Sequence, residues 1–200
     1  VSSLCALIKA KAAVNATSSD IHDLSRTPLH LAAENGHSAA VQVLVESNAD
    51  VTAVDDFHWT PLTVAAQKSH LEAVQVLINA KASLDPYVFT PLSRVAWNGN
   101  TAIVRVLIDA KASVNFQSYG ETPLHYAAGM GYEDIVQILI DAKASVDLRN
   151  SEGKTPLAAA AMDGQSKVMQ MLINAKANID AMNNHFQTPL YLAAQNGHLE

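Results

Sequence analysis

Residues 27–37 read Thr-Pro-Leu-His-Leu-Ala-Ala-Glu-Asn-Gly-His, and the first three of these residues recur along the chain. The Thr-Pro-Leu tripeptide starts at Thr27, Thr60, Thr90, Thr122, Thr155 and Thr188. Successive copies begin 33, 30, 32, 33 and 33 residues apart. A period near 33 residues indicates one supersecondary unit that has been copied, and copied units stack on their neighbours instead of enclosing a single core.

Each copy predicts two short helices joined by a turn. Thr27 is a favoured N-cap, and Pro28 suits the first helical position because the N–H it lacks would have no partner there. Gly36 can end the first helix in a left-handed conformation. A second helix follows, with Val41 and Leu44 three residues apart on one face. A polar, turn-forming loop then leads to the next Thr.

The stretch 27–37 resembles the ankyrin-repeat motif almost letter for letter, and residues 122–128 and 188–198 are similar to it. The resemblance covers essentially the whole chain. It implies an all-α fold, an ankyrin-repeat solenoid of helix-turn-helix units with projecting β-hairpin-like loops. We expect a single domain over 1–200, made of a partial repeat 1–21, repeats at about 22–54, 55–84, 85–116, 117–149 and 150–182, and a partial repeat 183–200. Because both ends stop within a unit, we expect a fragment of a longer array.

Composition excludes several classes of protein. Hydrophobic residues make up 49% of the chain and aromatic residues 6%, so the apolar content is mainly aliphatic and Ala-rich. The single Cys5 rules out an internal disulfide framework and favours an intracellular, cytoplasmic location. A net charge of -6 argues against nucleic acid as a partner. The apolar runs are far shorter than the ~18 residues that a membrane span needs.

The sequence predicts no catalytic site. Among His22, His58, His70 and His185 no pair has zinc-ligand spacing, and the sequence has no glycine-rich phosphate loop. For His30 and His125 the resemblance implies hydrogen bonds to loop backbone. We therefore expect no enzyme activity, no cofactor, no metal and no small-molecule substrate.

The residue after each second helix departs from the family pattern, which usually has Gly there. Here the places hold Lys11, Asn48, Lys81, Lys111, Lys143 and Lys176. A non-Gly residue at positive φ costs about 1 kcal/mol, whereas a Lys near a helix C-terminus gains about 0.3–1 kcal/mol from the helix dipole. We interpret these lysines as solvated caps; the alternative is a basic row for an acidic partner.

The repeat at 85–116 is irregular. The loop before it is shorter than the others and contains Pro86, and Arg94 stands where the other repeats have Leu31, Val64, Tyr126, Ala159 or Leu192. A charge at this half-buried place should extend its guanidinium towards water or find a carboxylate. The irregularity is either tolerated within the stack or forms a notch shaped for a ligand.

Aromatic residues mark the candidate binding surface. In the family, the loop tips and the outward face of the first helices form a concave binding side. The corresponding places here hold Phe57, Trp59, Tyr87, Phe89, Trp97 and Tyr119, which are six of the chain's eleven aromatic residues. With the polar neighbours His58, Gln67, Lys68 and Asn98 they form the predicted site. The alternative is local packing of some rings, with Phe57 and Phe89 as the first candidates.

Two functions follow from these expectations. The first is an interaction module that holds a protein or peptide partner on the loop and first-helix face, with aromatic side chains providing affinity and polar residues specificity. The second is a structural or regulatory segment of a larger enzyme, channel or secreted effector that contacts its own chain.

Overall fold

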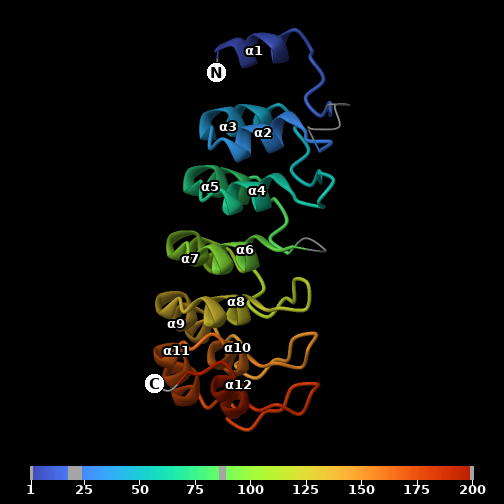
Figure 1. Ribbon diagram of the computed structural model, residues 1–200. Coiled ribbons are helices and arrows are strands. Elements are labelled where there is room, and N and C mark those ends of the chain that lie inside the picture. Colours follow the sequence, from blue (N-terminus) through green and yellow to red (C-terminus); the bar gives the residue numbers. More distant parts are fainter. Residues whose placement is uncertain (1, 18–23, 86–88, 199–200) are drawn as a thin grey trace. The chain divides into compact units, whose positions relative to one another are not determined.

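The structure, a computed structural model, describes residues 2–17, 24–85 and 89–198 (Figure 1). Within these residues the helices are α1 (Ser2–Lys9), α2 (Pro28–Glu34), α3 (Ser38–Glu46), α4 (Pro61–Gln67), α5 (Leu71–Asn79), α6 (Pro91–Asn98), α7 (Thr101–Asp109), α8 (Pro123–Met130), α9 (Glu133–Asp141), α10 (Pro156–Met162), α11 (Ser166–Asn174) and α12 (Pro189–Gln195). The one β-type pairing in the described segments is the antiparallel bridge between Ser118 and Glu121. The predicted all-α class of helix-turn-helix repeats is confirmed.

The chain forms two compact units, Val1–Pro91 and Leu92–Glu200, here called the N-terminal and C-terminal units. We call α2, α4, α6, α8, α10 and α12 first helices, and α1, α3, α5, α7, α9 and α11 second helices. In the N-terminal unit, α2 packs on α3 and α4, and α5 packs on α4 and α3. In the C-terminal unit, α10 packs on α8, α11 and α12, while α9 packs on α7, α8 and α11. The core therefore lies between neighbouring helices.

The Thr-Pro-Leu tripeptide starts the first helices in the way that its residue types predict. Thr27, Thr60, Thr122, Thr155 and Thr188 each accept, through the side chain, a hydrogen bond from the backbone N–H three residues ahead, and Pro occupies the first turn. The Leu that follows faces the interior: Leu29, Leu62, Leu92, Leu124 and Leu157 are at most 1% exposed. The tripeptide thus supplies a cap, a fixed φ and a core residue in three successive positions.

The ends of the second helices adopt the left-handed conformation that the sequence predicts. Lys11, Asn48, Lys81, Lys111, Lys143 and Lys176 have φ between 61° and 74°. All six side chains are exposed. Each chain turn is therefore closed by a strained but solvated residue, as expected for capping lysines.

Candidate partner-binding surfaces

In the N-terminal unit a tight hairpin loop presents the predicted aromatic residues. The buried carboxylate of Asp55 organises this loop, because its Oδ1 accepts hydrogen bonds from the backbone N–H groups of Phe57 and Trp59, both at 2.9 Å. Its Oδ2 accepts from Arg26 Nε at 3.2 Å. His58 lies at the tip with φ 60°, a left-handed conformation. The loop is thus fixed from within, and its tip side chains project outward.

The two rings of this loop and Phe89, which lies just before α6, form a series of increasing burial. Phe57 is 53% exposed, and its ring centroid lies 5.9 Å from that of the half-buried Trp59. The Trp59 ring lies 6.2 Å from Phe89, which is only 6% exposed. Phe89 therefore belongs to the core and Phe57 to the surface, although both stand in the predicted site. Tyr87 lies outside the described residues.

The polar residues beside these rings have charges that pair within the unit. Lys68 is exposed, and its Nζ lies 3.5 Å from the carboxylate of Glu34, which also binds Arg26 at 2.7 Å. Gln67 is partly buried at the end of α4. This surface, the N-terminal patch, consists of Phe57, His58, Trp59, Gln67 and Lys68. It presents aromatic side chains with little net charge.

In the C-terminal unit an arginine and two aromatic rings lie face to face. The guanidinium carbon of Arg94 is 4.9 Å from the ring centroid of Trp97, and the Trp97 ring stacks on Tyr126 with centroids 6.2 Å apart. Arg94 is only 8% exposed. Burial lowers the pKa of Arg94, and the neighbouring Tyr126 and Tyr119 oppose this effect. The guanidinium thus lies against an aromatic face, a favourable cation–π arrangement.

The outer part of this cluster is open to solvent. Trp97 is 41% exposed, Tyr119 is 67% exposed, and Asn98 lies exposed beside Trp97. The Tyr126 hydroxyl donates to the backbone carbonyl of Ser118 at 3.1 Å, which ties α8 to the loop that carries Tyr119. We call Arg94, Trp97, Asn98, Tyr119 and Tyr126 the C-terminal patch.

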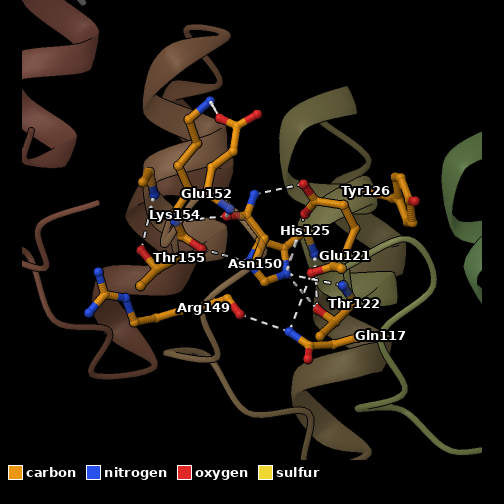
Figure 2. A network of polar contacts seen from close by, with 12 residues as sticks. Gln117, Glu121, Thr122, His125, Tyr126, Arg149, Asn150, Glu152, Lys154 and Thr155 are labelled. Carbon is orange, nitrogen blue, oxygen red and sulfur yellow. Dashed lines mark hydrogen bonds and ion pairs between the residues drawn. The ribbon is translucent and has the colours of Figure 1, made fainter. Parts of the chain in front are cut away.

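A network of polar contacts fixes the loop of this patch to the loop of the next repeat (Figure 2). Asn150 Nδ2 donates to Glu121 Oε1 at 2.6 Å, while Asn150 Oδ1 accepts from the backbone N–H groups of Glu152 and Lys154. Gln117 Nε2 donates to the Arg149 carbonyl at 2.7 Å. These hydrogen bonds hold the two hairpin loops together in a fixed arrangement.

His125 lies at the centre of this network as a neutral, buried ring. Its Nε2 donates to the Lys154 carbonyl at 3.0 Å, and its Nδ1 lies 2.8 Å from Thr122 Oγ1. Burial lowers the pKa of His125 to about 4, against the opposing effect of its backbone hydrogen bonds. Burial also raises the pKa of Glu121, whose Oε2 is 3.8 Å from His125 Nδ1. His30 Nε2 likewise donates to the Trp59 carbonyl at 3.0 Å, and burial lowers the pKa of His30 too.

The comparison with known families agrees with this geometry. The description of ankyrin repeats, a block of three copies, matches residues 2–88, 82–150 and 143–200. The chain belongs to the ankyrin-repeat family. Ankyrin repeats are generally protein–protein interaction modules and are typically not catalytic. Comparison with curated proteins found no match.

Two features of the ankyrin repeats escaped the sequence analysis. Phe186 is 84% exposed and has φ 61°, at the loop position that Gly153 occupies in the preceding repeat. Leu190 is 77% exposed, although its counterparts in the other repeats are buried. The sequence could have indicated Phe186, because it is an aromatic residue two places before Thr188. No local pattern indicates the exposure of Leu190, because that exposure depends on which helix packs beside it.

The described ranges contain neither a metal-binding cluster nor a membrane-spanning helix. No group of three or more His, Cys, Asp or Glu side chains is placed to hold a metal ion there. None of the helices in these ranges is both long and apolar enough to cross a membrane.

Proposed function

We propose that this chain binds a protein or peptide partner through the aromatic side chains of its hairpin loops and first helices. The N-terminal patch and the C-terminal patch are proposed as separate binding surfaces, one in each unit. The observation that carries the proposal is that Tyr119, Phe57 and Trp97 leave 67%, 53% and 41% of their surface in water. Large exposed aromatic side chains are costly in water and are enriched among the residues that dominate binding energy.

Rigidity supports the proposal. The loop of Phe57 is held by the buried Asp55, and the loop of Tyr119 by Asn150 and Gln117. A preformed surface loses little conformational entropy when a partner arrives, so more of the contact energy remains as affinity. These polar groups would act through the loops and would not touch the partner.

The expected partner offers apolar or aromatic side chains in preference to a block of charge. Glu34 already pairs with both Lys68 and Arg26, and Glu121 already accepts a hydrogen bond from Asn150. The buried Arg94 adds a planar cation behind Trp97. Specificity would then depend on the shape around the rings and on polar residues such as Asn98.

A displayed peptide library selected against the 200-residue chain tests the proposal. Selected peptides should bind the Tyr119→Ala, Trp97→Ala or Phe57→Ala variant at least tenfold more weakly, according to which patch they use. Ile173→Ala is the matched control, because Ile173 is 39% exposed but lies on the second helix α11. Peptides that bind all three aromatic variants as well as the unmodified chain would refute the assignment of both patches.

A further inference from the structure

Helices α6, α8 and α10 of the C-terminal unit end in residues of a different kind from those that end α2, α4 and α12. The seventh and eighth residues after the Thr of each Thr-Pro-Leu tripeptide are polar in α2, α4 and α12, where they are Glu34, Asn35, Gln67, Lys68, Gln195 and Asn196. In α6, α8 and α10 they are Trp97, Asn98, Gly129, Met130, Met162 and Asp163. Trp97 is 41% and Met130 48% exposed, so apolar side chains reach the surface at these helix ends.

Contacts join these helix ends into one surface. The Trp97 ring stacks on Tyr126 with centroids 6.2 Å apart. Tyr126, Gly129 and Met130 share one face of α8, because they are three and four residues apart. Helix α8 packs on α10 (Figure 1), and a β-carbon on Gly129 would lie only 3.0 Å from Asp163 Oδ2. The C-terminal patch therefore continues from Tyr126 across Gly129 to Asp163.

Gly129 lets the carboxylate of Asp163 lie against the backbone of α8. A glycine within a helix is less favourable than an alanine, and Gly129 does not have the left-handed conformation that would require one. A side chain at this position would crowd the Asp163 carboxylate. Gln165 Nε2 donates to the Gly129 carbonyl at 3.1 Å, which fixes the backbone beside it. The close approach of Asp163 thus accounts for the glycine.

The Asp163 carboxylate lies where two helices end. Asp163 is the C-cap residue of α10, and its side chain lies against the last turn of α8. Helix C-termini carry partial negative charge, so a carboxylate is unfavourable there. Two nearby lysines already have partners: Lys154 pairs with Glu152 at 2.7 Å, and Lys167 pairs with Glu133 at 3.3 Å. Within the described ranges the exposed Asp163 forms no ion pair.

We propose that the partner of the C-terminal patch carries a lysine or arginine beside an apolar residue, with the cation on Asp163 and the apolar residue on Trp97 and Tyr126. This inference rests on the proposed function and adds the charge of the partner to it. The cation faces a carboxylate and the negative ends of two helices, so the charges are complementary. Arg94, 4.9 Å from the Trp97 ring, repels a cation at the other end and sets the direction of the bound segment.

Two displayed peptide libraries of equal apolar and aromatic content test this proposal. One contains Lys and Arg but neither Asp nor Glu, and the other contains Asp and Glu but neither Lys nor Arg. Both are selected against the 200-residue chain. Peptides whose binding weakens about tenfold or more with Trp97→Ala should come from the basic library. They should bind Asp163→Asn about fivefold more weakly, and Asp163→Lys more weakly still.

Two controls separate the pairing from other effects of the substitution. Asp109→Asn makes the same charge change at an exposed residue that ends the second helix α7, and it should leave the affinity unchanged. Exchange of the basic residue of a selected peptide for Gln should weaken binding to the unmodified chain and leave binding to Asp163→Asn unchanged, as a double-mutant cycle requires. Asp163→Asn should also raise the urea midpoint of unfolding, because it removes a negative charge from two helix ends.

The possible results distinguish this proposal from the proposed function. Trp97-dependent peptides that lack a basic residue, or that bind Asp163→Asn as tightly as the unmodified chain, would overturn the pairing with Asp163 and leave the binding function intact. A lower urea midpoint for Asp163→Asn would show that the carboxylate serves the fold, which also overturns the proposal. If no selected peptide depends on Trp97, the C-terminal patch is not a binding surface and the proposal is wrong with it.

Discussion

Acidification should destabilise the protein through His125, and the size of this effect can be worked out from the structure. The ordinary pKa of a histidine is 6.5, and burial lowers that of His125 to about 4. Between these values the unfolded chain binds a proton that the folded chain does not. Stability therefore falls as the pH drops through this window. From pH 7.5 to pH 5 the loss is about 2 kcal/mol for this one ring.

The variant His125→Ala removes the titrating ring and has a precedent at the same position, because the next repeat reads Thr-Pro-Leu-Ala at 155–158. The variant should be less stable at pH 7.5 by about 1–3 kcal/mol, since it loses the bonds to Thr122 and to the Lys154 carbonyl. Its stability should nevertheless depend less on pH than that of the unmodified chain. The difference in urea unfolding free energy between pH 7.5 and pH 5 should shrink by about 2 kcal/mol.

Glu121 needs a control of its own, because its titration beside His125 changes the stability of the protein with pH in the opposite direction. Its pKa is raised by burial, so its contribution to stability is present at low pH and is lost as the pH rises through the folded value. The comparison is therefore repeated in a Glu121→Gln background, where the histidine effect should persist. His30 is present in all of these variants, so its contribution to the pH dependence cancels in the comparison. Equal pH dependence with and without His125 would show that the ring is not held neutral by burial.

Three further outcomes are expected. Phe186→Gly should be about 1 kcal/mol more stable in urea unfolding than Phe186→Ala, because only Gly relieves the left-handed strain at this position; equal stabilities would argue against strain there. Asn150→Asp should lose roughly 2 kcal/mol at pH 7, because its new charge faces Glu121 in place of the amide donor, and Glu121→Gln should restore most of this loss if that pairing is the cause. Thr155→Ala should cost about 1 kcal/mol and Thr155→Ser much less, as measured by thermal unfolding, because only the hydroxyl caps α10.

The fold could be predicted from the sequence because each repeat carries its own local instructions. The Thr-Pro pair begins a helix at Thr27 and where it recurs, and the residue after each second helix is left-handed whether it is a lysine, such as Lys143, or Asn48. These features depend on backbone chemistry within a few residues. The period then fixes which helices become neighbours, so no long-range information was needed.

Burial within the aromatic surface could not be predicted in the same way. Phe57 and Phe89 belong to the same class of loop position, yet one is 53% and the other 6% exposed. The Trp59 ring lies at a similar distance from both, 5.9 Å from Phe57 and 6.2 Å from Phe89, so a shared aromatic neighbour does not decide which ring is buried. Likewise, the sequence placed the Arg94 guanidinium either in water or beside a carboxylate, and did not predict that it lies 4.9 Å from the centre of the Trp97 ring. Such outcomes depend on packing across repeats, which a local pattern does not encode.

The lysines that close the second helices have a consequence for how this protein can be tuned. Each is a non-glycine residue with φ above 60° and an exposed side chain, so exchange for glycine releases about 1 kcal/mol of strain and loses the smaller gain, about 0.3–1 kcal/mol, that a lysine takes from the helix dipole. In an array whose energy is a sum over repeats and nearest neighbours, such gains accumulate one repeat at a time. Melting temperature can thus be raised stepwise by engineering, from Lys81 to Lys176, while both patches keep their composition.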